Sequence, residues 1–175
     1  MAINKTKIVL DSDVVIHFMK GDCLSLLFDI FPEYQYLILD VVYSELSKNS
    51  QTKTIIDNIS KYMPSKIERI EFKPTGAMMK EYARLIRNLG KGESACMIYC
   101  IDNQDVLGSS NLKDIKEYCE SHQITYLTTI DFLYYAYMRK IMTKQECDTF
   151  IQQVVSKGSK LPIVDISRYS CSVYI

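Results

Sequence analysis

Four short apolar segments, each running into a stretch with helical spacing, constrain the fold of this chain most. Apolar segments of this length are typical of strands that are buried on both faces of a sheet. Strands that alternate with helices are typical of a parallel sheet between layers of helices. The sequence therefore predicts an α/β fold, a three-layer α/β/α sandwich with a central parallel sheet. The four pairs are "KIVLD" with "SDVVIHFMKGD", "YLILD" with "VVYSELSK", "VLGSS" with "LKDIKEYCESHQ", and "ITYLTT" with "IDFLYYAYMRK".

Further segments complete the predicted set of elements. Apolar residues at helical spacing predict helices over "CLSLLFDIF", "TKTIIDNISKYM" and "TKQECDTFIQQVVSK". The last of these opens with Thr143 and Glu146 at the spacing of a capping box, and Gly21 is the expected end of the first helix. Two more helices are predicted over "TGAMMKEYARLIRNLGKGESACMIYCIDN", with a break at Gly90 and Gly92. The alternation of polar and apolar residues in "KIERIEF" predicts a short strand.

The length and composition of the chain favour one globular domain. A chain of 175 residues with 47% hydrophobic and 24% charged residues suits a single buried core. We expect this domain to span residues 1–155, followed by a C-terminal tail over 156–175 that forms an edge strand or stays extended. No apolar run approaches the roughly 20 residues of a membrane span, and the first residues lack the pattern of a signal peptide. A cytoplasmic location is the expectation.

The charge balance argues against a protein that coats nucleic acid by charge alone. Basic and acidic residues are equal at 21 each, so any contact with nucleic acid depends on a local arrangement of basic side chains. Small basic clusters exist, and each of them also fits an ordinary solvated helix face. The clusters are Lys61, Lys66 and Arg69; Arg84, Arg87 and Lys91; and Arg139 with Lys140.

The cysteines and histidines give no sign of a metal centre or a catalytic dyad. Six cysteines are scattered without a CxxC pair. Cys96 and Cys100 share a helix face, but no second pair or nearby histidine completes a zinc site, so we expect buried reduced thiols. His17 and His122 fall on separate predicted helices, and we interpret both as structural.

Acidic and polar residues follow the predicted strands, at the edge where an open parallel sheet binds its ligands. Carboxylates packed closely together raise one another's pKa unless a positive charge compensates them. A hard divalent cation such as Mg²⁺ or Mn²⁺ prefers oxygen ligands and supplies that charge. The residues in question are Asp11 and Asp13, Asp40 and Glu45, Glu93, and Asn111 with Asp114.

Several of these residues also have ordinary structural interpretations. Ser12 or Asp13 is the expected N-cap of the first helix, and Asp40 fits a cap or a loop position. Glu45 and Glu93 each fit an ordinary helical position, the latter in a first turn where a carboxylate suits the helix dipole. An acid that ends a buried strand, as Asp11 does, is costly without a partner, which favours a functional role for it.

Four motifs taken together resemble the PIN-domain family, and most closely its bacterial VapC-type toxins. The resemblance runs from residue 7 to about residue 155. It implies a three-layer α/β/α fold and a ribonuclease that depends on Mg²⁺ or Mn²⁺ and cuts RNA. The motifs are "IVLDSDVVIHFMKGD", "ILDVVYSELSK", "LGKGESACMIYCIDN" and "LGSSNLKDIKEYCESHQITYLTTIDFLYYAY".

The resemblance also assigns roles to individual residues. Asp11, Glu45 and Glu93 occupy the first three acidic positions, which implies that they bind the metal and act in catalysis. At the fourth position, where relatives commonly carry an aspartate, this chain has Asn111, whose amide oxygen can bind a metal or orient a water in catalysis but brings no charge. Asp114, one turn into the helix, is expected either to replace part of that charge as a further ligand or to cap the helix. Ser12 and Ser110 are the residues expected to position substrate or water.

The same resemblance implies partners. A VapC-type toxin is held inactive by an antitoxin that lies across the acidic groove, and the family tends to form homodimers. The expected partners are therefore RNA, an antitoxin protein and a second copy of the chain.

Two other classes of function stay open at this point. "VLDSDVV" also resembles the DxD loop of haloacid dehalogenase-like phosphohydrolases, with Asp11 as nucleophile and Asp13 as general acid. That family's usual Gly-Thr after the loop is replaced by Val14 and Val15. The other alternative is a PIN fold that has lost full metal binding and serves as an RNA-binding or protein-interaction module, which the missing acid at Asn111 favours.

Overall fold

The computed structural model describes residues 6–175 and contains a five-stranded parallel sheet within them. The first five residues of the predicted 1–155 domain, which also begin the stretch expected to lack a signal peptide, lie outside the described residues. The strands lie in the order β3-β2-β1-β4-β5. Successive strands are therefore added on one side of β1 as far as β3, and on its other side from β4 onward. The strands are β1 (Ile8–Leu10), β2 (Tyr36–Leu39), β3 (Ile67–Ile70), β4 (Val106–Gly108) and β5 (Tyr126–Leu127).

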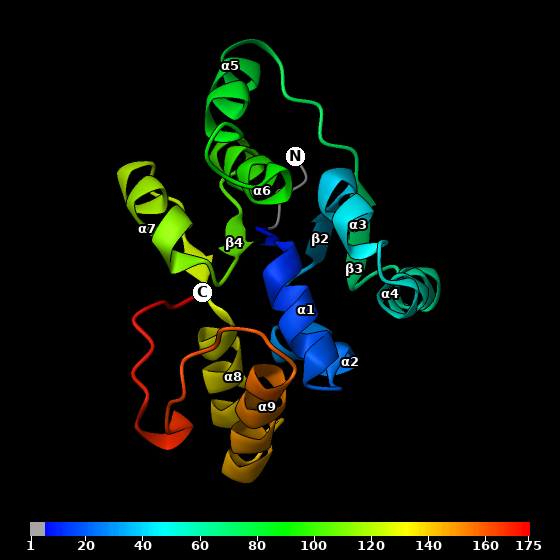
Figure 1. Ribbon diagram of the computed structural model, residues 1–175, viewed down its shortest axis with the longest axis vertical. Coiled ribbons are helices and arrows are strands. Elements are labelled where there is room, and N and C mark those ends of the chain that lie inside the picture. Colours follow the sequence, from blue (N-terminus) through cyan, green and yellow to red (C-terminus); the bar gives the residue numbers. More distant parts are fainter. Residues whose placement is uncertain (1–5) are drawn as a thin grey trace.

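Helices flank this sheet in the order that the sequence predicts, and the short strand over "KIERIEF" is present as β3. The fold is thus the predicted three-layer α/β/α arrangement in one domain (Figure 1). In the described part of the chain the α-helices are α1 (Ser12–Lys20), α2 (Leu24–Ile30), α3 (Asp40–Leu46), α4 (Ser50–Tyr62), α5 (Gly76–Leu85), α6 (Lys91–Asn103), α7 (Leu112–Ser121), α8 (Thr129–Met138) and α9 (Lys144–Ser156).

The core is built on the three central strands. Every residue of β1, β2 and β4 is buried, which accounts for their uninterrupted apolar sequence. Helix α6 packs across β1, β2 and β4 and is buried along most of its first two turns, including Glu93. All six cysteines are free thiols, and five of them are buried, which matches the interpretation as core residues.

Helix α1 begins with a different cap from the one predicted. Asp11, rather than Ser12 or Asp13, is the N-cap, and its Oδ1 accepts a hydrogen bond from the backbone N–H of Ser12 at 2.7 Å. The helix therefore starts one or two residues earlier than expected, directly at the end of β1. Gly21 ends the helix as predicted, with its N–H donating to the carbonyls of His17 and Met19.

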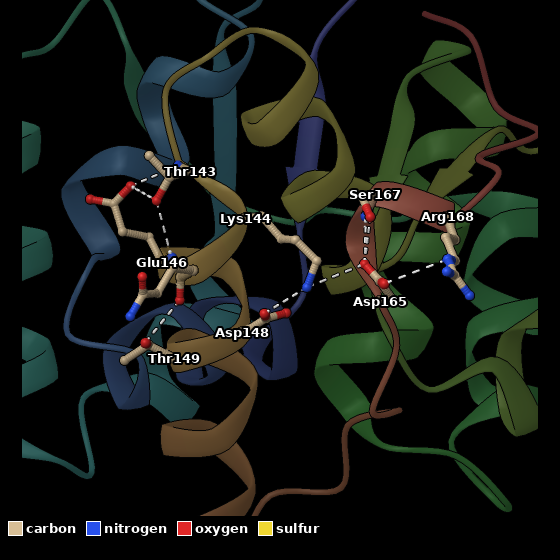
Figure 2. Close-up of polar contacts among 9 residues, drawn as sticks. Thr143, Lys144, Glu146, Asp148, Thr149, Asp165, Ser167 and Arg168 are labelled. Atoms are coloured by element: carbon tan, nitrogen blue, oxygen red, sulfur yellow. Dashed lines mark hydrogen bonds and ion pairs between the residues drawn. The ribbon is translucent and has the colours of Figure 1, made fainter.

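The predicted capping box of α9 is confirmed, and the neighbouring Lys144 contacts the end of the chain. Figure 2 shows Thr143 and Glu146 bonded reciprocally at the start of α9. Beside them the ammonium group of Lys144 lies 2.9 Å from Asp148 and 3.4 Å from Asp165, which precedes the 3₁₀ turn Ile166–Arg168 (Figure 2). This turn contacts both α8 and α9.

The segment that follows α9 adds no strand to the sheet. Helix α9 ends at Ser156, and the described residues that follow form one 3₁₀ turn and no strand. We call residues 157–175 the C-terminal tail. In Figure 1 the tail, drawn in red, passes beside α8 and returns toward the sheet. It is anchored by buried Ile166 and Cys171, by a hydrogen bond from Tyr169 to Asp131, and by one from Tyr135 to the carbonyl of Val173.

Candidate acidic site at the sheet edge

Asp11 lies at the carboxyl end of β1, beside the point where the strand order reverses. Its backbone N–H donates to the carbonyl of Gly108 at 2.8 Å, which extends the pairing of β1 with β4 by one residue. The side chain is 4% exposed, and its Oδ2 accepts a hydrogen bond from the Ser109 hydroxyl at 3.2 Å. Burial, followed by the charge of Asp13 and then those of Glu93 and Glu45, raises the pKa of Asp11 well above its ordinary value.

Asp13 faces the loop that follows β4, where two donors meet one of its oxygens. Its Oδ2 accepts from the backbone N–H of Ser110 at 2.8 Å and lies 3.5 Å from the Ser109 hydroxyl. Its Oδ1 is shielded from solvent and has no hydrogen-bond partner among the described residues. Burial raises the pKa of Asp13 in spite of these hydrogen bonds.

Glu45 reaches the same region from α3, which contacts both α1 and α6 (Figure 1). Its Oε1 accepts from the backbone N–H of Gly92, at the start of α6, at 3.1 Å. A Cβ atom at position 92 would lie 2.8 Å from Oε2, which is closer than atoms of this kind pack. Glycine at position 92 therefore lets α3 present this carboxylate to the first turn of α6.

Glu93, the next residue along, is 6% exposed. Burial is the main reason that its pKa rises to about 7, and the charges of Asp114 and Asp13 add to the effect. A hydrogen bond with the Asn111 side chain lowers the pKa, and the charge of Glu45 raises it again by a smaller amount. The charges of three other acids, which come from α1, α3 and α7, thus act on this buried carboxyl group.

Asn111 and Asp114 are paired with each other at the start of α7. Asn111 occupies the N-cap position, but its side chain accepts no capping hydrogen bond. Its Nδ2 instead donates to Oδ2 of Asp114 at 2.7 Å. The amide predicted to stand in for an acid is therefore engaged with the acid predicted to help it.

Sequence reasoning missed the polar chain behind Ser110. The Ser110 hydroxyl accepts from the backbone N–H of Thr129 and donates to its hydroxyl, both at 2.7 Å. The Thr129 oxygen lies 2.8 Å from Nδ1 of His17, a residue interpreted as structural, and burial lowers the pKa of that imidazole to about 4. A neutral ring can accept the Thr129 proton at Nδ1. No local motif indicates these contacts, because they join α1, the β4–α7 loop and α8.

Two further residues lie at the edges of the site. Ser12, the first residue of α1, is half-buried and donates its N–H to Asp11. Asp40 was interpreted as a cap or loop residue, but Leu39 is the N-cap of α3 and Asp40 is the first residue of the helix. The Oδ1 atom of Asp40 accepts hydrogen bonds from the N–H groups of Val41 and Phe72.

The donor set suits a cation that keeps part of its water shell. Among residues 6–175 no group of three or more Asp, Glu, His or Cys side chains is arranged to hold a metal ion. Mg²⁺ is commonly bound by only one or two carboxylates, with water and substrate phosphate completing its shell. The partnerless oxygen of Asp13, beside the buried carboxyl group of Asp11, fits such an ion.

Comparison with known proteins finds relatives by structure alone. No family model and no curated protein matches the sequence. The chain is similar to a chain of VapBC2 from Rickettsia felis, solved bound to a DNA fragment from its promoter, with a TM-score of 0.51 at 15% identity, over 70% of this chain and 98% of the other. A chain of VapBC-1 from nontypeable Haemophilus influenzae gives a TM-score of 0.52 at 12% identity, over 71% and 98% of the two chains.

These likenesses show that the chain has the PIN-like fold expected from the sequence motifs. At 12% and 15% identity these similarities support only the fold, and the roles of the acidic residues stay predictions. The part of the chain that the structure describes contains no helix long and apolar enough to cross a membrane.

Proposed function

We propose that this chain is an endoribonuclease that depends on Mg²⁺ or Mn²⁺, and that it is the toxin of a toxin–antitoxin pair. The observation that carries the proposal is the burial of Asp11 at the sheet's switch point, with the charges of Asp13, Glu93 and Glu45 all acting on it. Four acids in one electrostatic environment either take up protons or bind a compensating cation. The PIN-like fold and the similarity to VapBC chains support the same class of protein.

In this proposal Asp11, Glu45 and Glu93 would hold the cation, together with Asn111 and Asp114. When bound, the cation neutralises these carboxylates and supplies the Lewis acidity and the activated water that phosphodiester hydrolysis requires. The Ser109 hydroxyl orients the Asp11 carboxylate, since it donates to Oδ2.

Other residues of the rim orient substrate and hold RNA in the proposed enzyme. Ser110 is fixed by Thr129 on one side and by Asp13 on the other, so the loop after β4 is held in one position against the acids. Exposed Lys91 and Lys113, which flank Glu93 and Asp114 in sequence, are placed to contact the phosphate backbone.

The decisive test is RNA cleavage by the purified chain and by Asp11→Asn. With Mn²⁺ or Mg²⁺ we expect the wild type to cut single-stranded or structured RNA, and we expect Asp11→Asn to lose at least about 100-fold in rate, because it removes the most buried charge that holds the cation. EDTA should abolish the activity of the wild type. Asp102→Asn, an exposed change near the other end of α6, is the matched control and should cleave normally. Unimpaired cleavage by Asp11→Asn contradicts the assignment.

A second candidate function is an RNA-binding or protein-interaction module without catalysis. Two observations favour it: Asn111 brings no charge, and no group of three or more Asp, Glu, His or Cys side chains among the described residues is arranged to hold a metal ion. A calorimetric titration separates the two proposals, because a module of this kind binds RNA in EDTA and shows no heat of Mn²⁺ binding. The phosphohydrolase alternative gains no support from the matched structures.

The proposal includes two protein partners. An antitoxin segment lying across the acidic edge would keep the enzyme inactive, and a homodimer is the expected assembly. A short DNA-binding protein encoded next to this chain, and copurifying with it, is the expected sign of the antitoxin. Light scattering at several protein concentrations measures whether the chain forms a homodimer.

A further inference from the structure

One oxygen of Asp13 has no function in the fold as described. Oδ1 is shielded from solvent and accepts no hydrogen bond from residues 6–175, although buried polar atoms are almost always bonded. The residue does not cap α1, because Asp11 does so. Its other oxygen already accepts from the β4–α7 loop, which leaves Oδ1 as the part of the side chain without a partner.

The Asp13 carboxylate lies next to that of Asp11. The Ser109 hydroxyl is 3.2 Å from Oδ2 of Asp11 and 3.5 Å from Oδ2 of Asp13, so one group touches both side chains. The Asp13 charge also acts on Glu93. Two carboxylates held this close, in a site with few basic groups among its contacts, form a pair that a divalent cation can bridge.

Position 111 does not supply the second charge beside Asp11. Asn111 is neutral, and its amide is bonded to Asp114 at the start of α7. Asp13, by contrast, is attached to the same loop through the backbone N–H of Ser110. The carboxylate that lies between β1 and the β4–α7 loop therefore comes from α1.

We infer that Asp13 is itself a ligand of the divalent cation, that it binds through Oδ1, and that it replaces the charge missing at Asn111. This inference rests on the proposed function, because the cation is the one that the proposed hydrolysis uses. It differs from the assignment based on sequence, in which Asp114 replaces that charge and Asp13 is a cap.

The test is Mn²⁺ binding, measured by titration calorimetry on the full chain without RNA. Asp13→Asn keeps the shape of the side chain and an oxygen for the Ser110 N–H, and we expect it to weaken Mn²⁺ binding at least about tenfold. Asp13→Glu keeps the charge but moves the oxygens by one methylene, and it should also weaken binding. Asp114→Asn should have the smaller effect, and Asp102→Asn should have none.

A second measurement shows that the variants are folded. In EDTA the thermal midpoint of Asp13→Asn should equal or exceed that of the wild type, because a buried carboxylate near other acids is removed. Added Mn²⁺ should raise the midpoint of the wild type clearly and that of Asp13→Asn little.

The possible outcomes separate this inference from the proposed function. Equal Mn²⁺ affinity in Asp13→Asn and the wild type overturns the inference and leaves the ribonuclease proposal standing. Weaker Mn²⁺ binding in Asp13→Asn, with no RNA cleavage by the wild type, supports the inference and contradicts the ribonuclease. An absence of Mn²⁺ binding by the wild type overturns both.

Discussion

At the scale of single residues, Glu93 is a carboxyl group placed where its charge is unfavourable. Burial and the neighbouring acids raise its pKa from 4.5 to about 7. The folded chain therefore binds this proton more tightly than the unfolded chain does. Between about pH 4.5 and 7 the folded state holds more protons, so the free energy of unfolding falls as the pH rises through this window.

This pH dependence gives a prediction for Glu93→Gln. Without metal, the variant should be more stable than the wild type at pH 8 by about 1–3 kcal/mol, and the difference should shrink toward pH 4.5. Urea denaturation in EDTA at several pH values, followed by circular dichroism, measures it. Glu117→Gln, an exposed change on α7, is the control. A pH profile that Glu93→Gln leaves unchanged would show that Glu93 is not the group that titrates.

Single residues also show where prediction from the sequence ends. The acids after β1 and at the start of α6 were identifiable, because a charged residue at the end of an apolar strand or after a glycine break is a local signal. The contacts of Ser109 with Asp11 and Asp13 were not, since they join residues almost a hundred positions apart. The same holds for Thr129 and His17, whose partners are set by the packing of three elements.

At the scale of elements, the contact between α3 and α6 depends on the glycine at position 92, which has no side chain. The N–H of Gly92 donates to Glu45, and a Cβ at this position would lie 2.8 Å and 3.0 Å from the two carboxylate oxygens. The flexible end of the glutamate can move away from such an atom at small cost. The backbone of either helix does not need to change.

Gly92→Ala should therefore separate activity from stability. Alanine favours a helix over glycine by up to about 1 kcal/mol, so the free energy of unfolding should be unchanged or slightly higher. RNA cleavage should fall about tenfold or more, because Glu45 is displaced from its place at the site. Gly90→Ala has open space around its Cβ and should leave cleavage intact. Full activity of Gly92→Ala would mean that the position of Glu45 is unimportant.

The elements themselves were largely predictable. Strand and helix periodicities differ, so each buried strand and each amphipathic helix left its own pattern, down to the capping box of α9. The predicted N-cap of α1, Ser12 or Asp13, was wrong by one or two residues, because the three consecutive residues Asp11 to Asp13 all favour caps. The capping box of α8 was not predicted, because Thr128 lies in a segment expected to be a strand while its partner Asp131 lies in the expected helix.

At the scale of the whole molecule, the C-terminal tail ties the last two helices to the rest of the chain. Tyr169 donates to Oδ1 of Asp131 at 2.7 Å, while Oδ2 of the same carboxylate completes the capping box with Thr128. One side chain thus serves both the start of α8 and the docking of the tail. The sequence predicted that the tail would be extended or an edge strand, but nothing local indicated where it would attach.

Tyr169→Phe tests this attachment. Loss of a hydrogen bond to a carboxylate should lower the free energy of unfolding by about 1–2 kcal/mol. Tyr174→Phe, at a position that is 83% exposed, should change it by less than about 0.5 kcal/mol. Since the chain contains no tryptophan, far-ultraviolet circular dichroism in urea is the suitable measurement. Equal stability of the two variants would show that the tail is held by its apolar anchors alone.

The strand order has a consequence for the chain while it is being synthesised. β4 inserts beside β1, although the two strands are separated by almost a hundred residues. A nascent chain that has not yet reached Ser109 has Asp11 and Asp13 but lacks the Ser109 hydroxyl and the Ser110 N–H that orient them. The ribosome therefore releases the acidic edge in complete form only late in translation, after nearly two thirds of the protein has been made.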